Sequence, residues 1–444
     1  MKDPLRLVIL AAGQSKRFLS QTSKVLHPLA GKPILDHVLT TAAALEPEEL
    51  IVVASHALTQ ETLFQDMVQG RNGRVVVQDE PRGTADALLY ALEHSTHQDA
   101  NLLVLMGDAP LVPALLLHQL VDHPKTAHET IGLVAMRPDD PKGYGRCLLD
   151  DRGFVKRIVE EKDANPAEQT ETLCHTGVMW CAPAAIELLT NIPPSPATKE
   201  LYLTALVEHA LFNDQKTFFI EGSAKKFLGI NTKADLAHSE ALLQDELRAE
   251  ALARGVTLKD PASTFLACDT QLDADVVIDP FVVFGPGVVI EKGAHIKSFC
   301  TLSHTHVEKN AVIGPSAHLS EKTHVGQETV LGNFVEVKRS TLGKKVKAKH
   351  HTYLGDATLK DHVLVGAGTI TCNFDGAKKH QTVLEENAFI GSNTALIAPL
   401  TIGKNAFVGA GSTLTQNVPS DTLAVARAKT SLHPCKKKKN LKTL

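Results

Sequence analysis

The feature that most constrains this 444-residue chain is a six-residue spacing of aliphatic or aromatic side chains in its second half. A small residue often follows the apolar one, as in Ile313-Gly314 and Leu331-Gly332. The repeat runs in registered stretches through Leu272, Ile278, Phe284, Ile290, Ile296, Leu302, Val307, Ile313, Leu319, Val325, Leu331, Val337, Ile390, Leu396, Ile402, Val408 and Leu414. This period is typical of a β-helix in which each hexad forms one side of a triangular coil. Hexapeptide coils usually wind left-handed, an exception to the crossover rule, so we predict a left-handed parallel β-helix over residues 256–444.

Two segments interrupt or precede this repeat. The register fails over 366–389, and we therefore expect a loop there that projects from the coil, where functional residues often collect. Residues 232–255 form a proline-free, Glu/Ala/Leu-rich segment that ends at Gly255. This composition predicts a helix that connects the coil to the first part of the chain.

Residues 1–231 follow a different pattern. Apolar runs such as LRLVIL (5–10) and NLLVLMGD (101–108) alternate with amphipathic segments such as ILDHVLTTAAAL (34–45). Unbroken apolar strands that alternate with helices indicate a mostly parallel sheet covered on both faces. We therefore predict a Rossmann-like α/β domain here.

Charge and cysteine content narrow the class of protein. The formal net charge is −4, so no global basic field would attract nucleic acid or a membrane surface, and we expect neither as a partner. The run Lys436–Lys439 is either a solvated tail or a phosphate-attracting one. The seven cysteines form no CxxC pair, which argues against a disulfide framework or zinc site. With no signal peptide or apolar span of about 20 residues, the sequence predicts a cytoplasmic protein.

A glycine turn, LAAGQSKR, directly follows the first predicted strand, at the edge where open α/β sheets bind nucleotides. Arg17 and Lys24 follow closely and would place two cations beside exposed backbone N–H groups, as a triphosphate requires. Asp108, in MGDAPL, ends another predicted strand. Its carboxylate either caps the next turn or holds a cation such as Mg²⁺ together with phosphate oxygens, and the residues leave both readings open.

Two adjacent histidines, His350 and His351 in KHHTYLGD, fall within the predicted coil. Side chains on a flat β-face alternate in direction, which argues against joint metal binding. A corner would break this alternation. The residues therefore leave open whether either histidine is solvated or faces a groove as a proton acceptor.

An ordered set of motifs resembles the bacterial family of bifunctional N-acetylglucosamine-1-phosphate uridyltransferase/glucosamine-1-phosphate acetyltransferases. The motifs are LAAGQSKR, SKVLHPLAGKP, VQDEPRGTADAL, MGDAPL, KGYGR, IVEEKDA and GINTKADL, followed by the hexapeptide half. The resemblance covers essentially the whole chain. It implies acetyl transfer from acetyl-CoA to glucosamine-1-phosphate, then uridyl transfer from UTP to N-acetylglucosamine-1-phosphate. It also implies a homotrimer with active sites at subunit seams.

For the first half, the resemblance implies that Arg17 and Lys24 hold phosphates and that Asp108 and Asn231 bind Mg²⁺. The implied contacts to UTP and UDP-N-acetylglucosamine are Leu10, Ala11, Ala12, Gly13, Lys24, Gln78, Gly83, Thr84, Gly145, Glu160, His175 and Asn231. The sugar phosphate would attack the α-phosphorus of UTP in line. That reaction needs alignment and charge neutralisation but no covalent protein group.

For the second half, the resemblance implies that His350 is the general base and that Glu336 orients its ring. A base is required because the attacking amine is unreactive as ammonium. The implied contacts to glucosamine-1-phosphate are Lys338, Tyr353 and Lys379. The implied contacts to acetyl-CoA are Ala367, Asn373, Phe374, Ser392, Ala410 and Arg427.

Several positions in the first half depart from the family pattern. Ser15 and Lys16 replace a Gly-Thr, Met106 replaces a tyrosine, and His175 replaces an asparagine that contacts the acetylated sugar. Because an added lysine can still serve phosphates and a histidine can still form a hydrogen bond, we expect uridyl transfer to survive.

The departures in the second half fall on its substrate contacts. Ser320 replaces a phosphate-binding arginine, Leu364 an asparagine that contacts the amino sugar, and Phe374 a tyrosine. Two functions therefore compete: a bifunctional enzyme, or a uridyltransferase whose β-helix serves only as a trimerisation scaffold. A different sugar-1-phosphate nucleotidyltransferase, or acetylation of another amine, is a further alternative.

Overall fold

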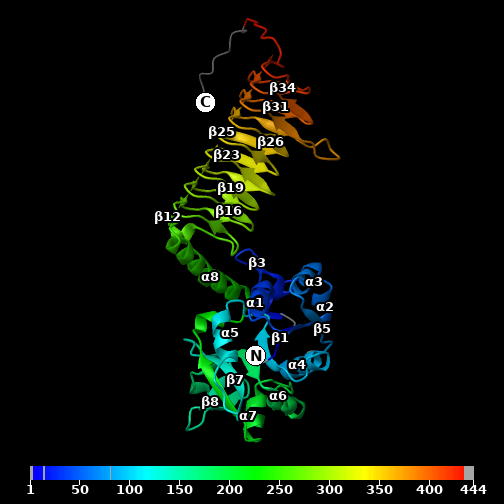
Figure 1. The fold of residues 1–444 in the computed structure, drawn as a ribbon, viewed down its shortest axis with the longest axis vertical. Helices are drawn as coiled ribbons and strands as arrows, with labels where there is room; N and C mark the ends of the chain where they lie inside the picture. Colours follow the sequence, from blue (N-terminus) through cyan, green and yellow to red (C-terminus); the bar gives the residue numbers. More distant parts are fainter. Residues whose placement is uncertain (1–3, 14–15, 81, 435–444) are drawn as a thin grey trace, which may run out of the picture. The chain divides into compact units, whose positions relative to one another are not determined.

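The computed structural model describes residues 4–13, 16–80 and 82–434. The chain divides into two compact units, residues 1–243 and 244–444, and the division falls inside helix α8 (Lys233–Ala253), where the connecting helix is predicted (Figure 1). None of the helices in the described ranges is long and apolar enough to cross a membrane. Ser15 and the run Lys436–Lys439 lie outside the described residues.

The first unit is built on a nine-stranded sheet of order β11-β7-β10-β6-β1-β4-β5, with β8 and β9 at one side of β10. Its strands are β1 (Leu5–Ala11), β4 (Glu49–Ala54), β5 (Arg74–Val77), β6 (Asn101–Met106), β7 (Glu129–Met136), β8 (Arg146–Leu149), β9 (Val155–Val159), β10 (Cys174–Cys181) and β11 (Lys216–Glu221). Its main helices are α1 (Ile34–Ala43), α2 (His56–Thr59), α3 (Thr62–Gln69), α4 (Thr84–Glu93), α5 (Ala114–Val121), α6 (Pro183–Ile186) and α7 (Ala205–Leu211). Strand β1 pairs in parallel with β4 and β6, whereas β10 runs antiparallel between β6 and β7.

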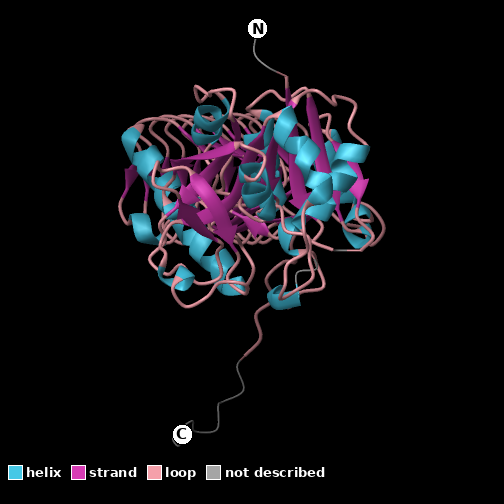
Figure 2. Ribbon diagram, turned by 90° about the horizontal axis from the view of Figure 1, so that it is seen from below, coloured by secondary structure: helices cyan, strands magenta, loops and turns pink. Residues whose placement is uncertain are grey.

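Strand β1 shows why the apolar runs of this unit are unbroken. Every residue from Leu5 to Ala11 is buried, and successive side chains enter two different hydrophobic cores. Leu7 and Ile9 pack with residues of α1 and α3, while Val8 and Leu10 pack with residues of α4 and α7. Figure 2 shows the helices lying on both sides of these strands. This confirms the predicted mostly parallel sheet with two covered faces.

The second unit is the predicted left-handed β-helix of hexapeptide repeats, with strands from β12 (Thr257–Leu258) to β35 (Leu423–Ala424) in parallel ladders (Figure 1). One eight-stranded ladder contains β13 (Gln271–Leu272), β16 (Val288–Ile290), β19 (Thr305–Val307), β22 (Thr323–Val325), β24 (Thr341–Leu342), β26 (Ala357–Leu359), β29 (Thr382–Leu384) and β32 (Leu400–Ile402). The predicted hexad residues are buried in one continuous core, with Leu272 packed at its edge. The six-residue period therefore marks the inward positions of the coil.

The projecting loop is shorter than the 366–389 segment that we predicted. Strand β28 (Ile370–Cys372) and β29 continue the ladders, so only residues 373–381 leave the coil. Thr371, six residues after Val365, is fully buried and takes the inward position of its hexad. A threonine there hides the aliphatic register from the sequence pattern while the coil itself continues.

One corner of the coil turns through residues with positive φ that are not glycine. They include Phe299 (63°), Phe334 (55°) and His351 (44°). This backbone region is uncommon for side chains other than Gly, Asn and Asp, so packing between coils must hold it. His351 is therefore a corner residue, and its neighbour His350 lies at the edge of the flat face.

Candidate functional site

The glycine turn after β1 opens onto a cavity at the carboxyl edge of the first unit's sheet. Apart from Arg17, every predicted nucleotide or phosphate contact from Leu10 to Thr84 lies along it. The cavity is lined by Leu10, Ala11, Ala12, Gly13, Lys24, Val25, Gln78, Gly83, Thr84, Ala87, Met106, Asp108, Glu200 and Tyr202. The structure thus brings together residues that lie far apart in the chain.

A second cavity adjoins the first and contains the predicted sugar contacts. It is lined by Leu10, Thr84, Met106, Asp108, Gly143, Tyr144, Gly145, Glu160, His175, Thr176, Gly177, Tyr202, Leu203, Thr204, Gly229 and Asn231. The two cavities share Leu10, Thr84, Met106, Asp108 and Tyr202. A nucleotide in one cavity would therefore meet a sugar phosphate in the other near Asp108.

A cluster of Lys24, Asp108 and Asn231 lies at this junction. The Lys24 ammonium is buried, contacts the Asp108 carboxylate and donates a hydrogen bond to Asn231 Oδ1 at 3.0 Å. Two oxygens from distant parts of the chain thus converge on one cation. Carboxylate and amide oxygens are hard ligands that suit Mg²⁺, so the residues present fit this ion. Over residues 4–13, 16–80 and 82–434, no group of three or more His, Cys, Asp or Glu residues could hold a metal ion.

Gly83 is required by the backbone of this site. Its φ is +123°, and a Cβ there would lie 2.3 Å from the carbonyl oxygen of Leu201. The neighbouring hydroxyl of Thr84 accepts a hydrogen bond from Leu203 N–H at 2.9 Å. These contacts hold residues 200–204 against the start of α4, and with them Glu200 and Tyr202. Neither of these lining residues was predicted, because KELYLT (199–204) carries no motif or charge pattern that marks a site.

Two polar side chains line the second cavity: buried His175 and half-buried Glu160. Burial raises the pKa of Glu160, whose Oε1 accepts a hydrogen bond from Thr204 Oγ1 at 2.7 Å. Burial lowers the pKa of His175 to about 4, so its ring is neutral at pH 7. Its Nδ1 has no hydrogen-bond partner within the described part of the chain. A neutral ring with an unsatisfied nitrogen is suited to a hydrogen bond with a polar ligand.

Arg17 and Gln78, predicted contacts to phosphate and nucleotide, differ in their burial and in whether they line a cavity. Arg17 lies in the short helix η1 (Lys16–Phe18), is exposed, and is not among the residues that line either cavity. Gln78 is buried and donates a hydrogen bond from Nε2 to Asp86 at 2.7 Å, which also pairs with Arg82 at 3.2 Å. The structure therefore places Lys24, but not Arg17, among the residues that line the first cavity.

In the second unit, His350 and Glu336 lie on neighbouring coils. Strand β25 (Lys347–Gly355) pairs with β23 (Val330–Lys338) so that His350 is opposite Asn333 and Glu336 is opposite Tyr353. Both side chains are exposed, and among the described contacts there is no hydrogen bond between them. The ring of His351 stacks on Phe334 with centroids 5.0 Å apart. Both histidines are exposed, but only the ring of His351 packs on an aromatic neighbour at the corner.

The predicted acetyl-CoA contacts form a column along the coil. Asn393 N–H donates to Ala367 O at 2.7 Å, and Gly411 N–H donates to Ser392 O at 2.8 Å. Arg427 closes the column with a contact to Ala410 O. The remaining acetyl-CoA contacts, Asn373 and Phe374, lie in the 373–381 loop together with Lys379, a predicted contact to glucosamine-1-phosphate, and Phe374 and Lys379 are exposed.

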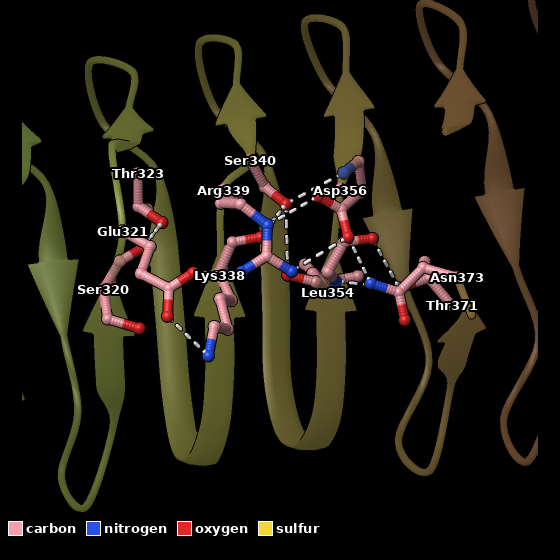
Figure 3. Close-up of polar contacts among 12 residues, drawn as sticks. Ser320, Glu321, Thr323, Lys338, Arg339, Ser340, Leu354, Asp356, Thr371 and Asn373 are labelled. Carbon is pink, nitrogen blue, oxygen red and sulfur yellow. Dashed lines mark hydrogen bonds and ion pairs between the residues drawn. The ribbon is translucent and has the colours of Figure 1, made fainter. Parts of the chain in front are cut away.

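The predicted acceptor contact Lys338 is paired with an acid of this same chain. Its Nζ lies 2.6 Å from Glu321 Oε1, and Ser320 is its register partner on the preceding coil (Figure 3). Leu364, at a position where the resemblance leads one to expect an amide, is 39% exposed. The surface predicted to bind the amino sugar therefore has fewer polar side chains and a different charge pattern from the one that the resemblance implies.

Both units resemble known protein domains. Residues 7–169 match a MobA-like NTP transferase domain, 262–365 a GMPPB C-terminal domain, and 381–416 six bacterial transferase hexapeptide repeats. The bifunctional protein GlmU of Paracoccus denitrificans is 40% identical over 98% of this chain and 96% of its own length. Those of Zymomonas mobilis and Ralstonia nicotianae are 38% and 39% identical, over 96% and 98% of this chain and 95% and 100% of their own lengths.

Proposed function

The chain belongs to the family of bifunctional GlmU proteins, and from this premise we propose that its two units catalyse consecutive transfers. The second unit transfers an acetyl group from acetyl-CoA to the amine of glucosamine-1-phosphate. The first unit then transfers a uridyl group from UTP to N-acetylglucosamine-1-phosphate and releases pyrophosphate. The observation that carries the proposal is the pair of adjoining cavities that share Asp108, with Lys24 at their junction.

In the first unit, the residues act by alignment and neutralisation of charge. The backbone from Leu10 to Gly13 and the α4 terminus at Thr84 hold the nucleotide, while Glu160 and His175 hold the sugar. Lys24 neutralises negative charge as pyrophosphate leaves the α-phosphorus. Asp108 and Asn231 would hold Mg²⁺, which when bound supplies further neutralisation of the phosphate oxygens.

In the second unit, His350 accepts a proton from the attacking amine as the new amide bond forms and the thiol of coenzyme A leaves. Its exposure on the coil leaves it accessible to substrate. A substrate on such an open surface needs a further wall, and we propose that a neighbouring subunit of a homotrimer supplies it. Glu336 would orient the ring in that assembled site, since the single chain contains no direct contact between them.

A second candidate function is a uridyltransferase whose β-helix is only a scaffold. Ser320, Leu364 and the Glu321–Lys338 pair favour it, because each reduces the contacts available to an amino-sugar phosphate. The purified protein should be given glucosamine-1-phosphate and acetyl-CoA with thiol release as the readout, and UTP and N-acetylglucosamine-1-phosphate with pyrophosphate release. Release of both products supports two activities. Pyrophosphate without thiol supports the scaffold.

We also propose that the protein works in the cytoplasm. Cys147, Cys174, Cys181, Cys300 and Cys372 form no disulfide within the described residues, which is consistent with a reducing compartment. Its proposed substrates are small phosphorylated metabolites. Fractionation of cells that express the full chain would test this location.

A further inference from the structure

A network of ion pairs runs across successive coils of the β-helix (Figure 3). Glu321 lies 2.6 Å from Lys338 Nζ and also contacts the guanidinium of Arg339. Arg339 in turn donates to both carboxylate oxygens of Asp356, at 2.7 and 3.0 Å. The Asn373 amide donates to that same Asp356. The network thus begins beside Ser320 and ends at the loop that carries the predicted substrate contacts.

Glu321 directly follows Ser320, and this neighbour is the register partner of Lys338 on the adjacent coil. Ser320 and Lys338 are register partners on adjacent coils, so a long cationic side chain at position 320 would lie beside Lys338 and reinforce it. The chain instead has an uncharged serine there and a carboxylate one residue later. The contact with Lys338, with a smaller one from Arg339, lowers the pKa of Glu321, so the carboxylate is charged at neutral pH.

We propose that Glu321 competes with the phosphate of the amino-sugar acceptor for Lys338. This inference rests on the proposed acetyl transfer, in which Lys338 binds that phosphate. The phosphate must replace the carboxylate on the lysine ammonium before the acceptor binds fully. Glu321 is therefore a specificity-determining residue that weakens the preference of the second unit for phosphorylated over unphosphorylated amino sugars.

Arg339 does not take over the role of a phosphate clamp. Its guanidinium is held by a two-point contact to Asp356, the geometry in which arginine–carboxylate pairs are strongest and most specific. Lys338, by contrast, carries a flexible stem and a single-point charge. When Lys338 moves to a phosphate, Glu321 keeps its contact with Arg339. The network can therefore release the lysine without leaving the carboxylate unpaired.

The test is a comparison of two acceptors in the full-length protein. Glu321→Gln preserves the shape of the side chain and removes its charge. We expect the KM for glucosamine-1-phosphate to fall about two- to five-fold, the range for an exposed ion pair, with kcat unchanged. The KM for glucosamine, which has no phosphate, should not change. A matched control is Glu386→Gln, which breaks the exposed Lys404–Glu386 pair (2.7 Å) elsewhere on the coil and should change neither KM.

An unchanged or raised KM for glucosamine-1-phosphate in Glu321→Gln would overturn the inference while leaving acetyl transfer in place. If the parent protein releases no thiol with either acceptor, the proposed acetyl transfer fails instead. Calorimetric binding of glucosamine-1-phosphate then decides the inference, since Glu321→Gln should still bind it about two- to five-fold more tightly. Equal or weaker binding by the variant would overturn it. Unchanged pyrophosphate release and circular dichroism would show that the variant is folded.

Discussion

The two units hold their central lysines in opposite environments. In the first unit, the side chains of Lys24 and Asp108 are 10% and 19% exposed, whereas in the second those of Lys338 and Glu321 are 31% and 48% exposed. Loss of one partner from a buried pair leaves an uncompensated charge and is costly, whereas exposed pairs contribute little. The buried cluster is therefore suited to a fixed catalytic role, and the exposed one to an exchange of partners.

The largest effect should come from removal of the proposed base in the second unit. His350→Ala should reduce thiol release by about 10²–10⁴-fold, the usual contribution of general base catalysis, while pyrophosphate release is unchanged. His351→Ala is the matched control because its ring packs on Phe334 at the corner. A parallel fall in both activities would contradict a dedicated role for His350.

The next effect tests the buried cluster of the first unit. Lys24→Met keeps the length of the side chain but removes the charge at the junction of the cavities. We expect pyrophosphate release to fall about 10²–10³-fold, as when a preorganised charge contact is lost. Lys32→Met, which breaks the surface pair with Asp36 at 3.1 Å, is the control and should have little effect. Comparable activity of the two variants would show that the buried ammonium is not needed.

Buried His175 should make the first unit sensitive to acid. Its pKa is lowered from 6.5 to about 4 in the folded chain, so the unfolded chain takes up a proton first as the pH falls. Stability is therefore lost between about pH 6.5 and pH 4, by as much as about 3 kcal/mol. His175→Asn should lose less over this range.

The single tryptophan, Trp180 in β10, allows this to be measured in the full chain by denaturant unfolding followed by fluorescence. His56→Asn, at an exposed histidine of the same unit, is the control and should follow the parent. An identical acid dependence of His175→Asn and the parent would show that His175 is not buried in neutral form.

A smaller effect concerns Gly83, whose backbone lies close to the backbone of Leu201. Gly83→Ala would push a methyl group against the Leu201 carbonyl and displace the segment that carries Tyr202. We expect the KM for UTP to rise about ten-fold, from a strain of about 1–3 kcal/mol. Gly153→Ala also has positive φ (+84°), but its Cβ would meet nothing within 4 Å, so it separates backbone strain from the clash. Equal KM values would contradict a role for this contact.

The smallest effect concerns a half-buried pair of the coil, in which His324 lies 2.9 Å from Glu308. Burial raises the pKa of Glu308, but hydrogen bonds from His324 and Gln327 outweigh it, and the net pKa is lowered. The ionised Glu308 carboxylate therefore stabilises the folded chain above the ordinary pKa of a glutamate. This stabilisation is lost as the pH falls below about 4. Glu308→Gln should cost less than about 1 kcal/mol at pH 7, and the cost should be smaller at pH 3 than at pH 7. Thermal melting at both pH values checks this, and an equal cost at both would contradict it.

Much of the architecture was predictable because both units have regular patterns. Continuous apolar runs predict strands that are buried on both faces. The side chains of β1 pack into two hydrophobic cores, as expected. The hexad predicts the inward positions of the coil, but Thr371 fills one of them and made the loop look longer than residues 373–381. The six-residue repeat is identified from apolar residues, so a buried threonine does not contribute to it.

The site was predictable only where motifs mark it. The glycine turn, Lys24 and Asp108 stand out at a predicted strand edge, and the structure gathers them around one cavity. Glu200 and Tyr202 were missed because their place depends on backbone contacts with Gly83 and Thr84. The predicted pairing of Glu336 with His350 stays a proposal for the assembled protein.

The sequence by itself determined that this protein joins a layered α/β unit to a hexad coil, because periodicity and strand burial are local properties that each segment carries. Only the tertiary structure decided which charges meet. Lys24 reaches Asn231 across 207 positions of the chain, and Glu321 reaches Lys338 through the register of adjacent coils. Ion pairs depend on separations of a few ångströms, which folding creates and spacing along the chain does not specify.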